Sequence, residues 1–166
     1  QKSINLIGAF QAENLLMAAI LVIASGQEES GIFEILENIK PVRGRMELAA
    51  TKKNGATIYI DYAHTPDAIE VALKSLKPHI LGKLIVVIGA GGDRDKGKRP
   101  LMGTAAEKNS DFVIITDDNP RNEDPSVIHQ MIKNGIQNDN KVKVIADRAE
   151  AILTAVDLLE VGDGLL

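Results

Sequence analysis

Residues 84–92 have the sequence LIVVIGAGG, in which five apolar residues are followed by a run of small ones. A short segment that is apolar and β-branched throughout is typical of a parallel strand covered on both faces. Residues 112–116 (FVIIT) and 142–145 (VKVI) have a similar character. We therefore expect three strands of one parallel sheet in this part of the chain.

The stretches around these strands fit helices. Residues 66–77 place apolar side chains at helical spacing, residues 125–135 end at a glycine, and residues 147–159 begin with a capping aspartate. Alternating strands and helices predict an α/β fold, with an open, mostly parallel sheet and helices on both faces, as in Rossmann-like domains. Ligands of such folds bind just beyond the carboxyl ends of the strands.

The N-terminal part of the chain is helical instead. Residues 10–24 are rich in alanine and leucine and lack glycine and proline, so they predict a helix that Gly26 stops. A second helix is expected over residues 30–39, with Ser30 as its N-cap.

A change of pattern near residues 41–44 indicates a domain boundary. Beyond it, residues 46–50 and 57–60 are strand-like and are joined by KKNG, in which Asn-Gly is a strong hairpin signal. The sequence therefore predicts a helical part over residues 1–42 and an α/β domain over residues 43–166.

The composition limits the classes of partner. The chain has 166 residues, a formal net charge of -4 and a pI of about 5.4, so it has no large cationic field for nucleic acid or anionic membranes. Its longest apolar run, residues 15–24, is shorter than the roughly 20 residues that cross a bilayer. The absence of cysteine excludes disulfides and thiolate nucleophiles. We expect a cytoplasmic protein without membrane insertion or a nucleic-acid partner.

The segment GAGGDRDKGKRP at residues 89–100 follows the first of these strands. Its glycines allow a sharp turn with exposed backbone amides, and Arg94, Lys96, Lys98 and Arg99 gather positive charge at the same edge. A carboxylate or a phosphate is the implied ligand. The segment is not a Walker loop, because no Gly-Lys-Ser or Gly-Lys-Thr follows a four-residue spacer. The alternative is a tight turn whose charges are only solvated.

Two other segments that follow strands carry polar side chains. In Asp118-Asn119-Pro120-Arg121 a guanidinium and an amide lie two residues apart and can address one ligand, although Asn-Pro alone is often only a turn. His64 lies between a strand and the start of a helix, where an imidazole can contact a phosphate or carry a proton. All three segments lie where the fold predicts a site.

Four runs in series resemble one family: GRME at residues 44–47, DYAHTPDA at 61–68, GGDRDKGKRPLMG at 91–103 and DNPR at 118–121. In order and spacing they are similar to the Mur ligases, and among these to the UDP-N-acetylmuramoyl-tripeptide synthetases of the MurE type. The resemblance extends over nearly the whole chain. It implies that residues 1–42 are the C-terminal end of the central ATPase domain and that residues 43–166 are the C-terminal, amino-acid-binding domain.

The resemblance implies the activity of an ATP-dependent carbon–nitrogen ligase. Such enzymes use ATP and magnesium to phosphorylate a substrate carboxylate, and an incoming amine then attacks the acyl phosphate. The implied substrates are UDP-MurNAc-L-Ala-D-Glu and meso-diaminopimelate, joined by a monomeric enzyme of peptidoglycan precursor synthesis.

The resemblance also assigns residues. It implies a diaminopimelate site made by Arg94, Asp118, Asn119, Pro120 and Arg121, and nucleotide contacts made by Arg45, His64 and Asn14. A second carboxylate on the amino acid needs a cation that a lysine substrate would not need, which agrees with the arginine of DNPR. Gln11 departs from the asparagine that many relatives have at that position.

Several family motifs do not occur between Gln1 and Leu166. The P-loop and the carbamylated lysine are expected upstream, and a Gly-Lys-Gly-His-Glu segment is expected beyond Leu166. We therefore expect this chain alone to have no catalytic residue, no metal ligand and no ligase activity. Because the last strand starts only at residues 164–166, we also expect a weakened sheet edge near residues 142–145.

Two alternatives remain open. A related ligase of the same superfamily adds lysine, another diamino acid such as lanthionine, or, in folate metabolism, glutamate. The DNPR run argues against lysine and glutamate and leaves lanthionine harder to exclude. The alternative of a different class is a non-catalytic anion-binding module on the same scaffold.

Overall fold

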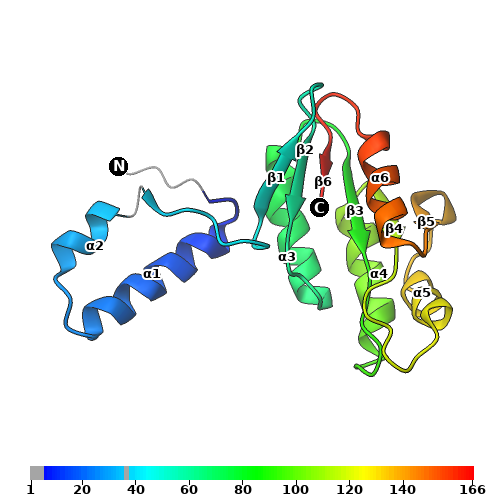
Figure 1. The fold of residues 1–166 in the computed structure, drawn as a ribbon, viewed down its shortest axis with the longest axis horizontal. Coiled ribbons are helices and arrows are strands. Elements are labelled where there is room, and N and C mark those ends of the chain that lie inside the picture. Colours follow the sequence, from blue (N-terminus) through cyan, green and yellow to red (C-terminus); the bar gives the residue numbers. More distant parts are fainter. Residues whose placement is uncertain (1–5, 36–37) are drawn as a thin grey trace.

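One six-stranded sheet organises the structure, a computed structural model that describes residues 6–35 and 38–166 (Figure 1). Its strand order is β1-β2-β6-β3-β4-β5. The strands are β1 (Glu47–Thr51), β2 (Thr57–Ile60), β3 (Leu84–Ile88), β4 (Phe112–Ile115), β5 (Val142–Val144) and β6 (Gly164–Leu165). β1 pairs antiparallel with β2, and the other pairs are parallel, which confirms the mostly parallel α/β sheet.

Helices cover both faces of this sheet. They are α3 (Pro66–Leu76), α4 (Lys98–Asn109), α5 (Pro125–Lys133) and α6 (Arg148–Leu158), with short 3-10 helices at Lys77–His79 and Asp139–Lys141. Alternate residues of β3 enter different cores: Val86 and Ile88 pack with α3, α4 and α5, whereas Ile85 packs with α6. This alternation explains why the strand is apolar at every position.

Local capping signals position three of these helices. Thr65 caps α3, Asp124 caps α5 and Asp147 caps α6, each by accepting a hydrogen bond from a backbone amide of the first turn. α4 begins after Gly97 without a side-chain cap. Its charged first turn carries no helix signal, so the bounds of this helix could not be predicted from the sequence.

The chain returns to the middle of the sheet at β6. Gly164 pairs with Thr57 of β2 on one side and with Leu84 of β3 on the other. The reason for expecting a weakened edge near residues 142–145 was therefore wrong, because the short strand β6 is not a neighbour of β5, and the weakened edge itself stays a prediction. β5 is the outer strand, and its residues are half-buried or exposed rather than covered on both faces.

The N-terminal helices project away from the sheet (Figure 1). α1 (Ala9–Ala24) ends just before Gly26, whose φ of 95° lies in the left-handed region, and Phe10 in its first turn packs against the larger core. α2 (Glu29–Ile35) starts before Ser30, so the expectation that Ser30 is its N-cap was wrong. The rest of that expected helix includes residues 36 and 37, which lie outside the described residues. No helix in the described ranges is long and apolar enough to span a bilayer.

Close packing of α4 against α5 predicts a strong effect of one methyl group. A Cβ atom on Gly103 would lie 2.1 Å from the carbonyl oxygen of Ile132. Gly103→Ala should push the two helices apart and lower the free energy of unfolding by about 1–3 kcal/mol, measured by urea denaturation. Gly31→Ala is the control, since a Cβ there meets no atom within 4 Å. Equal denaturation midpoints for Gly103→Ala and the unsubstituted chain would contradict this packing.

Candidate functional site

A cavity of about 600 Å³ opens at the carboxyl ends of the parallel strands. Its wall includes His64 after β2, Arg94 after β3, Asn119 and Arg121 after β4, and Arg148 after β5. The fold therefore brings the three segments singled out in the sequence into one site, and adds a fourth segment to them.

The segment after β2 is tied down through its aspartate. Asp61 accepts hydrogen bonds from the backbone amides of Met46, at 2.9 Å, and Ala63, at 2.8 Å. These bonds join the end of β2 to the residues that precede β1. Asp61 is thus committed to holding the backbone that presents His64 to the cavity.

Tyr62 connects two of the proposed nucleotide contacts. The guanidinium of Arg45 lies over the exposed tyrosine ring, 4.9 Å from its centroid, as a cation–π pair. The imidazole of His64 meets the same ring edge-on at 5.2 Å, and its Nδ1 lies 3.0 Å from the Tyr62 carbonyl oxygen. The guanidinium, the phenol ring and the imidazole thus form one contiguous group on the β2 side of the cavity, in which Arg45 supplies the positive charge.

Arg99 was expected to offer its positive charge to a bound anion, but its side chain is buried and already paired. Its side chain is only 1% exposed and forms two hydrogen bonds of 2.8 Å with the carboxylate of Glu123. A further bond of 3.2 Å runs from Nη2 to the carbonyl oxygen of Gly91. The expectation for Arg99 was wrong, because a carboxylate from the loop before α5 already neutralises its charge.

Two other cations of this segment also have partners. Lys96 lies 3.4 Å from Glu123, and Lys98 lies 3.9 Å from Asp95. Arg94 makes no ion pair within the described ranges, and it lines the cavity. Arg94 is therefore the cation of the glycine-rich loop that is available to an external carboxylate.

The glycine-rich loop and the loop at residues 118–121 interlock. The amide of Gly92 donates to the Asn119 carbonyl at 2.8 Å, and Arg121 Nη1 donates to the Gly92 carbonyl at 2.7 Å. A Cβ on Gly92 would lie 1.8 Å from the Pro120 carbonyl oxygen, so only glycine permits this approach. Arg121 also lines the cavity, and its other guanidinium donors are available to a ligand.

Asp117, which precedes this loop, is held from three sides. Its amide donates to the Ala146 carbonyl at 3.1 Å, its carbonyl accepts from Arg148 Nη1 at 3.1 Å, and its Oδ1 lies 2.7 Å from His129 Nε2. Neither His129 nor Arg148 was predicted as a site residue. The position of Arg148 just after β5 is the one sequence signal that points to it, whereas no sequence signal pairs His129 with Asp117.

The proposed site residues fall into three groups. Those that line the cavity are Arg94, Asp118, Asn119, Arg121 and His64. Pro120 lies in the same loop but not in the wall, and Arg45 adjoins the cavity through Tyr62. Asn14 is exposed on α1 and is not part of the wall.

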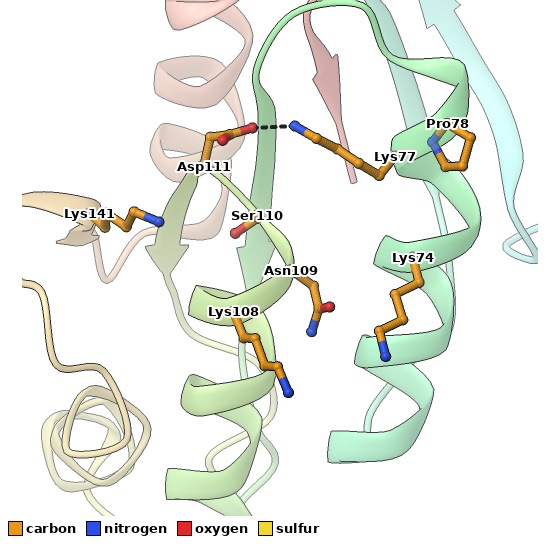
Figure 2. A pocket seen from close by; sticks show the side chains of 8 residues that line it. All are labelled: Lys74, Lys77, Pro78, Lys108, Asn109, Ser110, Asp111 and Lys141. Carbon is orange, nitrogen blue, oxygen red and sulfur yellow. Dashed lines mark hydrogen bonds and ion pairs between the residues drawn. The ribbon is translucent and has the colours of Figure 1, made fainter.

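A second cavity, of about 500 Å³, lies near the amino ends of the parallel strands (Figure 2). Lys77 bonds to Asp111 there at 2.6 Å, as Figure 2 shows, and Lys74 pairs with Glu70. Lys74 and Lys108 lie in the last turns of α3 and α4, where positive charge stabilises the helix dipole. The fold itself therefore explains these lysines, whereas the cations of the larger cavity face a wall built from four loops.

The described residues hold no group of three or more side chains that fits a metal ion. Magnesium is bound through several oxygen ligands or through substrate phosphates. The magnesium that the family resemblance implies was expected to be held by residues outside this chain, and that expectation stays a prediction.

Residues 44–166 match the family model described as Mur ligase, glutamate ligase domain. Over 161 residues the chain is 48% identical to the UDP-N-acetylmuramoyl-L-alanyl-D-glutamate--2,6-diaminopimelate ligase of Bradyrhizobium diazoefficiens. That match covers 97% of this chain and 32% of the relative, so the chain spans about a third of the length of the curated relatives it matches.

Solved structures share the architecture. A structure of UDP-N-acetylmuramoyl-L-alanyl-D-glutamate--2,6-diaminopimelate ligase is 38% identical with a TM-score of 0.72, over 99% of this chain and 34% of that one. Folylpolyglutamate synthase from Thermotoga maritima is 30% identical with a TM-score of 0.67, over 98% of this chain and 36% of that one. Proteins with different names therefore share this fold.

The Arg99–Glu123 pair predicts how stability depends on pH. Its hydrogen bonds lower the pKa of Glu123 from 4.5 to about 2. A carboxyl whose pKa falls on folding stabilises the fold above its unfolded pKa, and this contribution is lost as the pH falls from about 4.5 to about 2. Glu123→Gln should therefore lower the melting temperature at neutral pH by several degrees, and the difference should shrink through this window.

Melting curves by circular dichroism between neutral pH and about pH 2.5 measure this effect. Asp157→Asn is the matched control, because Asp157 is exposed and its side chain makes no hydrogen bond or ion pair in the part of the chain that is described. A difference between Glu123→Gln and the unsubstituted chain that stays constant down to the lowest pH would refute the stabilising role of the pair.

Proposed function

We propose, because the chain belongs to the Mur ligase family, that it is part of an ATP-dependent ligase that adds meso-diaminopimelate to UDP-MurNAc-L-Ala-D-Glu. One observation carries the proposal. Arg94, Asn119 and Arg121 meet in a single cavity, in a chain that is 48% identical to a relative named for this ligation. The whole enzyme acts as a cytoplasmic monomer in peptidoglycan precursor synthesis.

The two parts of the chain then belong to two domains of the enzyme. Residues 1–42 form the end of the central ATPase domain, and residues 43–166 form most of the C-terminal, amino-acid-binding domain. Support comes from the family match, which starts at residue 44, and from the way α1 and α2 project from the sheet (Figure 1).

The charges of the cavity fit a diamino dicarboxylic acid. Such a molecule has two carboxylates and two ammonium groups, so its site needs both cations and anions. Arg94 and Arg121 offer guanidinium groups to the carboxylates, and Asp118 and Asn119 offer oxygens to the ammonium groups. Lysine would leave a guanidinium of this cavity without its anion, which disfavours lysine as the substrate.

The reaction takes place in two steps. ATP transfers its terminal phosphoryl group to the carboxylate of the UDP-linked dipeptide, which gives ADP and an acyl phosphate. The amine of the amino acid then attacks the acyl carbon, phosphate leaves, and the nitrogen loses a proton to give the amide. Magnesium neutralises phosphate charge when it is bound, and the described residues of this chain are given no part in holding it.

The residues of this chain contribute by positioning. By holding the carboxylates, Arg94 and Arg121 aim the amine at the acyl carbon, which raises its effective concentration. Arg45 and His64 lie on the β2 side of the site, where their charge and ring edges suit the nucleotide. Interlocking of the two loops through Gly92 keeps Arg121 in place before the substrate arrives.

Substitution of Arg121 tests the substrate in the full-length enzyme. Loss of a charge-assisted hydrogen bond costs about 1.5–3 kcal/mol, so Arg121→Ala should reduce the ratio of kcat/KM for meso-diaminopimelate to that for lysine by roughly ten- to a hundredfold. Arg121→Lys keeps the charge but loses the two-pronged geometry of the guanidinium. Its ratio of kcat/KM values should therefore lie between those of the unsubstituted enzyme and Arg121→Ala. The KM for ATP should change little.

Lys53→Ala serves as the control for lost charge, since Lys53 is exposed in the β1–β2 turn and lies outside the cavity wall. Because Arg121 also bonds to Gly92, total activity will fall for structural reasons, and only the ratio reports substrate choice. An unchanged ratio in Arg121→Ala would show that Arg121 supports the loop without recognising the second carboxylate.

A further inference from the structure

We propose that Arg148 is a third arginine of the amino-acid site and that, together with Arg121, it holds the carboxylate farthest from the reacting amine. The proposal rests on the proposed function. It adds a specificity residue from a fourth loop, that between β5 and α6, to the two arginines already placed in the cavity.

The guanidinium of Arg148 makes no ion pair within residues 6–35 and 38–166. The arginines and lysines of the cavity wall are Arg94, Lys98, Arg99, Arg121 and Arg148. Lys98 and Arg99 have carboxylate partners, whereas the other three make no ion pair in the part of the chain that the structure describes. The wall also contains three carboxylates, those of Asp61, Asp95 and Asp118. Its cations outnumber these anions, so the unpaired guanidinium groups are available to the carboxylates of a ligand.

Arg148 is oriented before a ligand binds. Its Nη1 donates to the Asp117 carbonyl at 3.1 Å, and the Asp117 amide donates to the Ala146 carbonyl at 3.1 Å. These bonds use one guanidinium nitrogen and leave the others available. Arg121 is arranged in the same way, with Nη1 on the Gly92 carbonyl. Both arginines therefore lose little side-chain entropy when they bind a carboxylate.

The order of the loops decides which end of the amino acid Arg148 meets. The strand order places His64, after β2, at one end of the cavity and Arg148, after β5, at the other. In the proposed reaction the amine faces the acyl phosphate, on the nucleotide side with His64. The far end of the amino acid then lies beside β4 and β5, where Arg121 and Arg148 lie. Arg148 thus meets the carboxylate that lysine lacks.

A purely structural role makes a different prediction. If Arg148 only supports the Asp117 carbonyl, a neutral side chain that can still donate a hydrogen bond should replace it without changing substrate preference. Glutamine is such a side chain. Arg148→Gln removes the charge and keeps a donor, whereas Arg148→Ala removes both.

The test is made on the full-length enzyme with Arg148→Gln, Arg148→Ala and the control Lys143→Gln. Lys143 is an exposed cation of β5 outside the cavity wall, so its replacement matches the change in net charge. We expect both Arg148 variants to lower the ratio of kcat/KM for meso-diaminopimelate to that for lysine by roughly tenfold or more. We expect Lys143→Gln to leave the ratio unchanged, and the melting temperature and the KM for ATP to stay near wild type in Arg148→Gln.

Each result of this test either supports or overturns a proposal. If Arg148→Gln keeps the wild-type ratio, the proposal is overturned, whether or not total activity falls. If wild type does not turn lysine over at all, the KM for meso-diaminopimelate decides, because a lost carboxylate contact raises it while a merely weakened loop also changes the KM for ATP. A wild-type enzyme that does not use meso-diaminopimelate would refute the proposed function itself, a result distinct from a wild-type preference that Arg148→Gln leaves intact.

Discussion

The ion pair between Arg99 and Glu123 holds the candidate site together. Arg99 comes from the start of α4 and Glu123 from the loop before α5, and their two 2.8 Å hydrogen bonds join the loops that follow β3 and β4. A guanidinium that is only 1% exposed is unfavourable without a partner, so the loops cannot separate unless Arg99 reaches water. Close contact between Gly92 and the Pro120 carbonyl then becomes possible, and it sets the position of Arg121.

Neutralisation of Arg99 also determines which charges remain for a ligand. Lys98 has a carboxylate partner as well, whereas Arg94, Arg121 and Arg148 have none within the described ranges. The remaining arginines come from the loops that follow β3, β4 and β5, at the carboxyl ends of these strands. Arg121 and Arg148 each donate a hydrogen bond to a backbone carbonyl. These arginines are the groups that the proposed ligand, which has a carboxylate at each end, would meet.

The sequence predicted the elements whose signals are local. The apolar run at β3 and the capping residue Asp147 are of this kind, and both were placed correctly. Long-range pairing was not predictable in the same way. Nothing near Arg99 indicates that Glu123 will neutralise it, and nothing near Gly164 indicates that β6 enters the middle of the sheet. The site segments were found because they follow strands and carry unusual runs of residues, whereas Arg148 is a single arginine after a helix-capping aspartate and gives no such signal.

The central claim is that three arginines from three loops form one amino-acid site. A crystal structure of the full-length enzyme with meso-diaminopimelate bound tests it most directly. We predict that one carboxylate lies within hydrogen-bond distance of Arg94 and that the other lies between Arg121 and Arg148, with the Arg99–Glu123 pair unchanged. A bound amino acid that leaves Arg121 and Arg148 in contact with solvent alone, or that lies outside this cavity, would contradict the account.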